Sequence, residues 1–102
     1  MAKLMVMYKD EKDPAAFDKY YFDTHIPIAK KIPGLKRFEV SQGPVVTPAG
    51  PSGFHLIAML YFDDMAAIQK AFASPEGQAA SADVQKFTTD PPRMILFETR
   101  EI

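Results

Sequence analysis

Cysteine is absent from the 102-residue sequence. Its absence excludes disulfide bonds, cysteine-ligated zinc or iron–sulfur sites and a thiol nucleophile. Long apolar runs are also missing, because no segment approaches the ~20 residues that a transmembrane helix needs. The N-terminal segment has a short apolar run ended by charges and lacks a small-residue cleavage site, so we expect no signal peptide. These absences predict a cytoplasmic protein that does not bind membranes.

An excess of charge of one sign is missing too. The 12 basic and 13 acidic side chains leave a net charge of −1, and the sequence has no basic stripe of the kind that binds nucleic acid. It has no glycine-rich phosphate loop. The histidines, His25 and His55, do not have the spacing of paired metal ligands. We therefore predict no metal, no cofactor and no nucleic-acid partner.

The residues that are present predict one α+β domain spanning residues 1–102. Short apolar runs indicate strands, and Asp or Ser followed by proline marks helix starts. The expected strands are Leu4–Tyr8, Leu35–Ser41, Phe54–Phe62 and Met94–Thr99, and the expected helices are Pro14 to about His25, Pro27–Lys31, Met65–Phe72 and Pro75 to about Phe87. This βαββαβ order, with its second helix split, is that of a ferredoxin-like fold with a four-stranded antiparallel sheet in the order 4-1-3-2.

Local rules set the expected ends of the first helix. Asp13 is a suitable N-cap. Ile26 precedes Pro27, and steric crowding disfavours helical backbone at the residue before proline, so we expect the helix to end at about His25. The glycine- and proline-rich residues 43–53 are expected to form a long hairpin loop.

The central strands are apolar on both faces, although helices should cover only one. The apolar residues expected on the second face are Met5, Met7, Ile57, Met59 and Tyr61. Leaving each of them exposed to water forfeits about 1.5–3 kcal/mol of burial and creates an apolar patch larger than monomers normally carry. We therefore predict a homodimer that packs sheet against sheet around a central barrel.

The stretch "KYYFDTHIP" at residues 19–27 places a histidine beside three aromatic residues. Phe17, Tyr21 and His25 follow one another at a spacing of four and share the apolar side of the helix. His25 is thus expected to face the sheet at the carboxyl end of the helix. There it is able to donate or accept a proton in a pocket walled by tyrosines.

A second interpretation makes the same residues structural. His25 can be a capping or core residue whose ring nitrogens are satisfied by the backbone, and Tyr20 and Tyr21 can be core aromatics with hydrogen-bonded hydroxyls. His55 is a weaker candidate, expected on the strand face that carries Tyr61. Asp18 is expected at the wet margin of the helix and not as a partner of His25.

The chain resembles the EthD family, which is named for a protein of ethyl tert-butyl ether degradation. The resemblance rests on "FDKYYFDTHIP" at residues 17–27, "PGL" at 33–35 and "FASPEGQ" at 72–78. It implies the dimeric α+β barrel superfamily, whose members include isomerases, polyketide cyclases, decarboxylases and cofactor-free monooxygenases. These relatives share a pocket for a small, mostly apolar organic molecule and often use a histidine for proton transfer. His25 is the residue that matches the family histidine.

These observations lead to a functional hypothesis with two alternatives. The leading one is a cofactor-independent lyase or isomerase of catabolic or polyketide-type chemistry, with His25 as the catalytic proton carrier and Tyr8, Tyr20, Tyr21 and Phe22 contacting the substrate. The first alternative is a non-catalytic dimeric carrier or accessory protein that supports an oxygenase degradation system. The second is a dimer with a filled core and no pocket.

Overall fold

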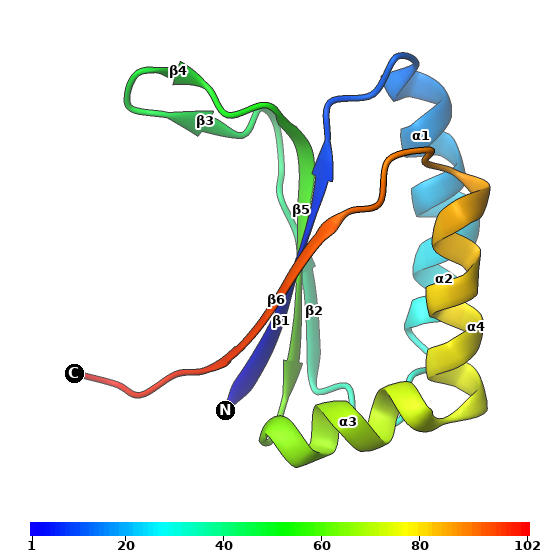
Figure 1. Ribbon diagram of the computed structural model, residues 1–102, viewed down its shortest axis with the longest axis vertical. Helices are drawn as coiled ribbons and strands as arrows, with labels where there is room; N and C mark the ends of the chain where they lie inside the picture. The colour runs from blue at the N-terminus through cyan, green and yellow to red at the C-terminus, as the bar shows by residue number, and fades with distance from the viewer.

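Helices cover one face of a four-stranded antiparallel sheet and leave the other face open (Figure 1). The computed structural model describes all 102 residues. In chain order the elements are β1 (Ala2–Lys9), α1 (Pro14–Tyr20), the π-helical turn η1 (Tyr21–His25), α2 (Ile26–Ala29), β2 (Arg37–Val40), β3 (Val46–Thr47), β4 (Gly50–Pro51), β5 (Phe54–Phe62), α3 (Met65–Ala73), α4 (Pro75–Asp83), the 3₁₀ turn η2 (Val84–Lys86) and β6 (Arg93–Glu98). Helices α1, α2 and α4 lie along the covered face, and α3 crosses one end of the sheet (Figure 1).

The strand order is β2-β5-β1-β6. Since β5 and β6 are the third and fourth strands of the predicted fold, this is the predicted order 4-1-3-2, and the ferredoxin-like α+β fold is confirmed. Strands β1 and β5 occupy the centre and pair antiparallel, with Leu4 opposite Leu60 and Met5 opposite Met59. Strands β2 and β6 form the two edges.

The predicted division of the central strands into two apolar faces is also confirmed. Every even-numbered residue of β1 is buried beneath the helices, as are the even-numbered residues of β5 from Leu56 to Phe62. The odd-numbered residues Met5, Met7, Ile57, Met59 and Tyr61 stay partly exposed on the open face. Both parities therefore present apolar side chains, but only one of them is covered within the subunit.

Polar caps fix where the helices begin. Asp13 is the N-cap of α1 and accepts a hydrogen bond from the Ala16 amide at 3.1 Å. Asp64 caps α3 in the same way. Ser74 ends α3 and starts α4, because its hydroxyl oxygen accepts a hydrogen bond from the Gly77 amide at 3.0 Å. The second helix is therefore split where the sequence predicted the split.

The expected end of the first helix at about His25 was wrong. Ile26 has helical backbone angles, φ −58° and ψ −47°, and the helix runs on to Ala29. The π-helical turn explains why proline is tolerated here. The amide of Ile26 bonds to the carbonyl of Tyr21, five residues back, and this wider turn relieves the crowding that a proline ring causes in a regular α-helix.

Residues 43–53 form the expected hairpin loop, and within it β3 and β4 pair as a short ladder. The β3–β4 hairpin projects from the sheet on the side opposite the helices, and the C-terminal residues also extend on that side (Figure 1). Val46 in this hairpin is 66% exposed. The open face of the sheet is thus flanked by a projecting arm with an apolar residue on it.

Gly77 lets α4 approach the end of α3 closely, and this contact leads to a test. A Cβ at Gly77 would overlap the carbonyl oxygen of Ala71 and lie 2.7 Å from the Cα of Phe72. We expect Gly77→Ala to lower the free energy of unfolding by about 1–3 kcal/mol through overpacking, measured by urea denaturation. Helix propensity alone predicts the opposite, a gain of about 1 kcal/mol, so a stabilised variant would contradict the close contact. Ala79→Gly on the exposed side of α4 reports the propensity effect by itself.

Candidate functional site

A cavity of about 280 Å³ lies between the sheet and the helices. Its walls are mostly apolar and come from both layers. On the sheet side they include Leu4, Val6 and Ala58, and on the helix side Ala29 and Ala80. The volume is near the lower end of the range of about 300–1,000 Å³ typical of small-molecule sites. This cavity is the candidate ligand site, and its presence favours the two pocket-based hypotheses over a filled core.

His25 is the last residue of the π-helical turn and lines this cavity. Its ring is buried, with 5% of the residue exposed. Nδ1 of His25 lies 2.9 Å from Oδ2 of Asp83, and the hydroxyl of Tyr20 donates to Oδ1 of the same carboxylate at 2.7 Å. One carboxylate of α4 thus receives hydrogen bonds from two side chains of the first helical segment.

Asp83 was missed by the sequence analysis, although a signal was present. Gly77, Ala80 and Asp83 recur at a spacing of three and form the buried side of α4. The two small residues let the helix pack closely against its neighbours, and α4 contacts α2. An acidic residue on the buried side of a helix requires a partner. That requirement could have directed attention to His25 and Tyr20.

The hydrogen bond to Asp83 determines how His25 presents its second nitrogen. A carboxylate only accepts, so Nδ1 carries the proton and Nε2 keeps a lone pair. Nε2 has no hydrogen-bond partner in the protein and is not fully enclosed by it. The same holds for the hydroxyls of Tyr8 and Tyr21, which line the same cavity. One proton acceptor and two hydroxyl groups therefore remain available to a ligand.

Burial governs the protonation of these groups. It lowers the pKa of His25, an effect that the neighbouring Asp83 carboxylate opposes. Burial also raises the pKa of Tyr8, and the negative charge of Asp83 adds to this. The pKa of Tyr21 is raised by burial and by the proximity of Tyr8. At neutral pH the site thus favours a neutral imidazole beside two protonated phenols.

Aromatic rings hold the imidazole in place. The ring centroid of Phe87 lies 4.7 Å from that of His25, and the ring of Tyr21 lies 5.3 Å from it on another side. Phe87 also stacks on Tyr20 at 5.6 Å. Phe87 was not a sequence-based candidate. It follows η2, and only the folded structure shows that its ring packs against both Tyr20 and His25.

The structure separates the predicted site residues into three groups. His25, Tyr8 and Tyr21 lie together at the cavity. Tyr20 does not line the cavity but binds Asp83. Phe22 is 46% exposed and lines a different hollow, beside the β3–β4 hairpin.

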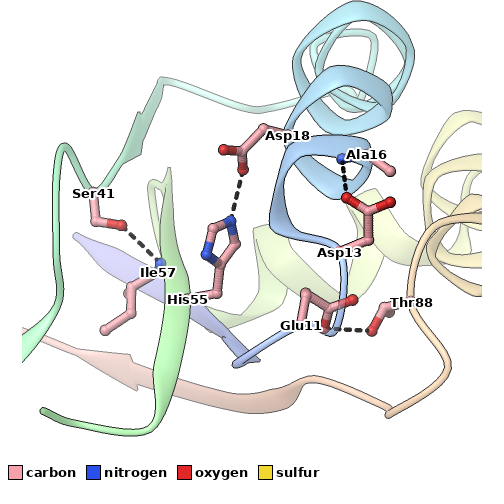
Figure 2. Close-up of polar contacts among 8 residues, drawn as sticks. All are labelled: Glu11, Asp13, Ala16, Asp18, Ser41, His55, Ile57 and Thr88. Atoms are coloured by element: carbon pink, nitrogen blue, oxygen red, sulfur yellow. Dashed lines mark hydrogen bonds and ion pairs between the residues drawn. The ribbon is translucent and has the colours of Figure 1, made fainter.

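The expectation that His55 lies on the same strand face as Tyr61 was wrong. The pairing of β1 and β5 shifts register next to His55, since Tyr8 pairs with Leu56 but Lys9 pairs with Phe54. This bulge turns His55 toward the helices. Figure 2 shows the ring reaching toward α1, where Nε2 lies 2.7 Å from Oδ1 of Asp18. Asp18 is accordingly a partner of His55.

The groove beside His55 differs from the cavity. It has a volume of about 900 Å³, and its walls come largely from the segments flanking and forming the β3–β4 hairpin. The Asp18 side chain is 47% exposed, so the pair sits at the surface. Figure 2 also shows Ser41, whose hydroxyl oxygen accepts a hydrogen bond from the Ile57 amide at 3.0 Å and so anchors the chain leading into the hairpin.

No cluster of three or more potential metal ligands occurs in the structure. None of the helices is both long and apolar enough to cross a lipid bilayer.

Comparison with known proteins gives consistent results. The sequence pattern of the EthD domain matches residues 9–91. A protein of Rhodococcus erythropolis, described as an uncharacterized 11.0 kDa protein in the thcB–thcC intergenic region, is 37% identical over 102 residues, covering 100% of this chain and 98% of that protein.

Among solved structures, a protein of the ethyl tert-butyl ether degradation family from Bacillus halodurans has a TM-score of 0.89 at 37% identity, covering 98% of this chain and 99% of that one. SnoaB, a cofactor-independent oxygenase from Streptomyces nogalater, has a TM-score of 0.68 at 16% identity, covering 99% and 94% of the two chains. The second likeness is one of fold alone.

The contact between His25 and Asp83 is testable by NMR titration of the imidazole. We expect His25 in the wild-type protein to titrate below the usual value of about 6.5, because burial lowers its pKa. In Asp83→Asn the pKa should fall further, since burial remains while the charge that favours imidazolium is lost. Asp18→Asn, which removes the matching carboxylate beside His55, should leave the His25 titration unchanged. An unchanged His25 pKa in Asp83→Asn would contradict the pairing.

Proposed function

The chain belongs to the EthD family, and from this we propose that it binds a small, mostly apolar organic molecule beside His25 and transfers a proton on it without a cofactor. The reaction class is that of a lyase or isomerase. The single observation that supports the proposal is the hydrogen bond from His25 Nδ1 to Asp83 at 2.9 Å, because it leaves Nε2 unprotonated on a residue that lines an apolar cavity.

The chemistry follows from the three groups at the cavity. His25 Nε2 accepts a proton from an acidic C–H bond of the substrate, and the electron pair of that bond moves onto an adjacent carbonyl oxygen. Hydroxyls of Tyr8 and Tyr21 donate hydrogen bonds to that oxygen as its negative charge develops. Asp83 stabilises the imidazolium that forms. Return of the proton to a different carbon completes an isomerisation, and departure of a leaving group completes an elimination.

Tyr20 acts one step further from the substrate. Its hydroxyl donates to Oδ1 of Asp83, which leaves Oδ2 directed at His25. Tyr20 is therefore a positioning residue. A cofactor is not required by this scheme, and the fold is shared with SnoaB, a protein described as a cofactor-independent oxygenase. The alternative of a non-catalytic carrier for an oxygenase system predicts ligand binding without proton exchange.

We further propose that the protein forms a homodimer through the open face of the sheet. This face carries Met5, Met7, Ile57 and Met59 in its two central strands, and no element of the subunit covers it (Figure 1). The β3–β4 hairpin projects on the same side, where it is able to pack against a second subunit. A Bacteroides fragilis protein of similar fold is described as dimeric.

Proton transfer can be measured as deuterium uptake by the methyl group of acetonaphthone, an enolisable ketone, in heavy water. We expect the protein to accelerate this exchange and His25→Gln to lose about 10²–10⁴-fold of the rate, the usual contribution of a general base. The exchange rate should rise with pH as His25 loses its proton and then reach a plateau. The midpoint of this rise should lie below pH ~6.5, because burial lowers the pKa of His25.

The second histidine supplies the control. His55→Gln removes the other histidine–aspartate pair and should leave exchange unchanged. If His25→Gln exchanges as fast as the wild-type protein, His25 is not the base. Binding of the ketone without any exchange would favour the carrier.

The dimer is testable by sedimentation at micromolar concentration. We expect the wild-type protein to sediment as a dimer and Met59→Asp to sediment as a monomer. Dimerisation of the variant would bury a carboxylate at the centre of an apolar face without an ion-pair partner, which costs more free energy than the interface gains. Ala66→Asp on the exposed side of α3 introduces the same charge and should remain dimeric. A stable wild-type monomer would refute the proposed interface.

A further inference from the structure

The cavity beside His25 is lined without a single Lys, Arg, Asp or Glu side chain. Its polar lining consists of Tyr8, Tyr21, His25, Ser81, Gln85 and Thr88. The hydroxyl of Thr88 is engaged with the Glu11 carboxylate at 3.1 Å, as Figure 2 shows. The polar atoms offered to a ligand are thus hydroxyls, an amide and an imidazole nitrogen. None of them carries a permanent positive charge.

The charged groups that hydrogen-bond to the lining residues are negative, because Asp83 contacts His25 and Glu11 contacts Thr88. Asp83 is buried, with 4% of the residue exposed, and lies directly behind the imidazole of His25. Its charge reaches into the cavity, because it contributes to raising the pKa of Tyr8. Lys31 and Lys86 line a separate outer hollow together with Asp83 and do not line the cavity. The cavity therefore has no cation among its own lining residues to compensate the Asp83 carboxylate.

An anionic ligand would meet two penalties in this space. It would lose its hydration in an apolar enclosure, and burying an unpaired charge is among the largest costs in protein energetics. It would also be repelled by Asp83 through a medium of low dielectric constant. A neutral oxygen atom meets neither penalty and can accept hydrogen bonds from protonated phenols.

We propose that this cavity selects uncharged ligands that carry a carbonyl or comparable acceptor oxygen, and that it discriminates against organic carboxylates of the same shape. The selection comes from the chargeless lining together with the buried Asp83 carboxylate behind His25. It rests on the proposed function only in taking the cavity as the ligand site. The acceptor oxygen is placed near the hydroxyls of Tyr8 and Tyr21.

Acetonaphthone and naphthoate, substituted at the same ring position, provide a matched pair of probes. They share a ring system, but acetonaphthone carries a neutral methyl ketone and naphthoate carries a carboxylate. By isothermal titration calorimetry near neutral pH, we expect the wild-type protein to bind the ketone at least about tenfold more tightly than the carboxylate. Equal affinity, tighter binding of naphthoate, or failure of the ketone to bind at its solubility limit would each overturn the proposal.

A charge-addition variant tests the cause. Gln85 lines the cavity from η2 and is exposed on its other side, so Gln85→Arg should bring a cation to the cavity and reduce the preference for the ketone by at least about tenfold. Gln69→Arg makes the same change on the exposed surface of α3, away from both the cavity and Asp83, and should keep the wild-type preference. An unchanged preference in Gln85→Arg, with circular dichroism showing a folded protein, would overturn the electrostatic cause.

These results are separable from the test of proton transfer. A protein that prefers the ketone but does not exchange its methyl protons supports the ligand class and refutes the catalytic proposal. A protein that exchanges the ketone's protons but binds naphthoate equally well supports catalysis and refutes the selection.

Discussion

A buried carboxylate must find hydrogen-bond donors, and the position of Asp83 makes this requirement the link between the two halves of the chain. Its oxygens accept from Tyr20 and His25, which are 63 and 58 residues away in sequence. Removing either donor leaves a charged group partly unsatisfied in a low-dielectric interior, which is far more costly than losing a surface contact. The relative placement of α4 and the first helical segment is therefore constrained by the same three groups that prepare His25 for chemistry.

The protein contains two histidine–aspartate pairs, and their surroundings give them different properties. His25 and Asp83 are both enclosed, whereas the side chains of His55 and Asp18 are 21% and 47% exposed. Solvent screens the second pair and competes for its hydrogen bonds. The first pair lies against an apolar cavity, where electrostatic interactions are stronger. Residue type alone does not distinguish these pairs, and burial does.

Much of the architecture could be predicted from the sequence because it depends on local periodicity. The alternation in residues 54–62 gave the faces of β5, and Asp13 and Ser74 gave the starts of two helices. The placement of His25 on the apolar side followed from its spacing to Phe17 and Tyr21. These patterns are read within one element and need no knowledge of its partners.

The remaining features depend on contacts between distant segments. Asp83 is recognisable as a site residue only when α4 is laid against the first helix. His55 could not be oriented, because a single extra residue in β5 opposite Tyr8 and Lys9 reverses the expected face. Phe22 follows Tyr21 in the π-helical turn and points to the hairpin groove, so membership of an aromatic run did not place it at the cavity.

The π-helical turn also determines the angular phase of the first helix. In a regular α-helix, residues four apart drift by about 40° around the axis, so a row of such residues gradually leaves the surface it started on. The wider turn from Tyr21 to His25 counters this drift, and Phe17, Tyr21, His25 and Ala29 are all buried in one line. If the same residues wound as a regular α-helix, His25 would lie about 80° and Ala29 about 120° around the axis from Phe17. The direction in which the imidazole faces thus depends on the number of residues per turn as much as on residue identity.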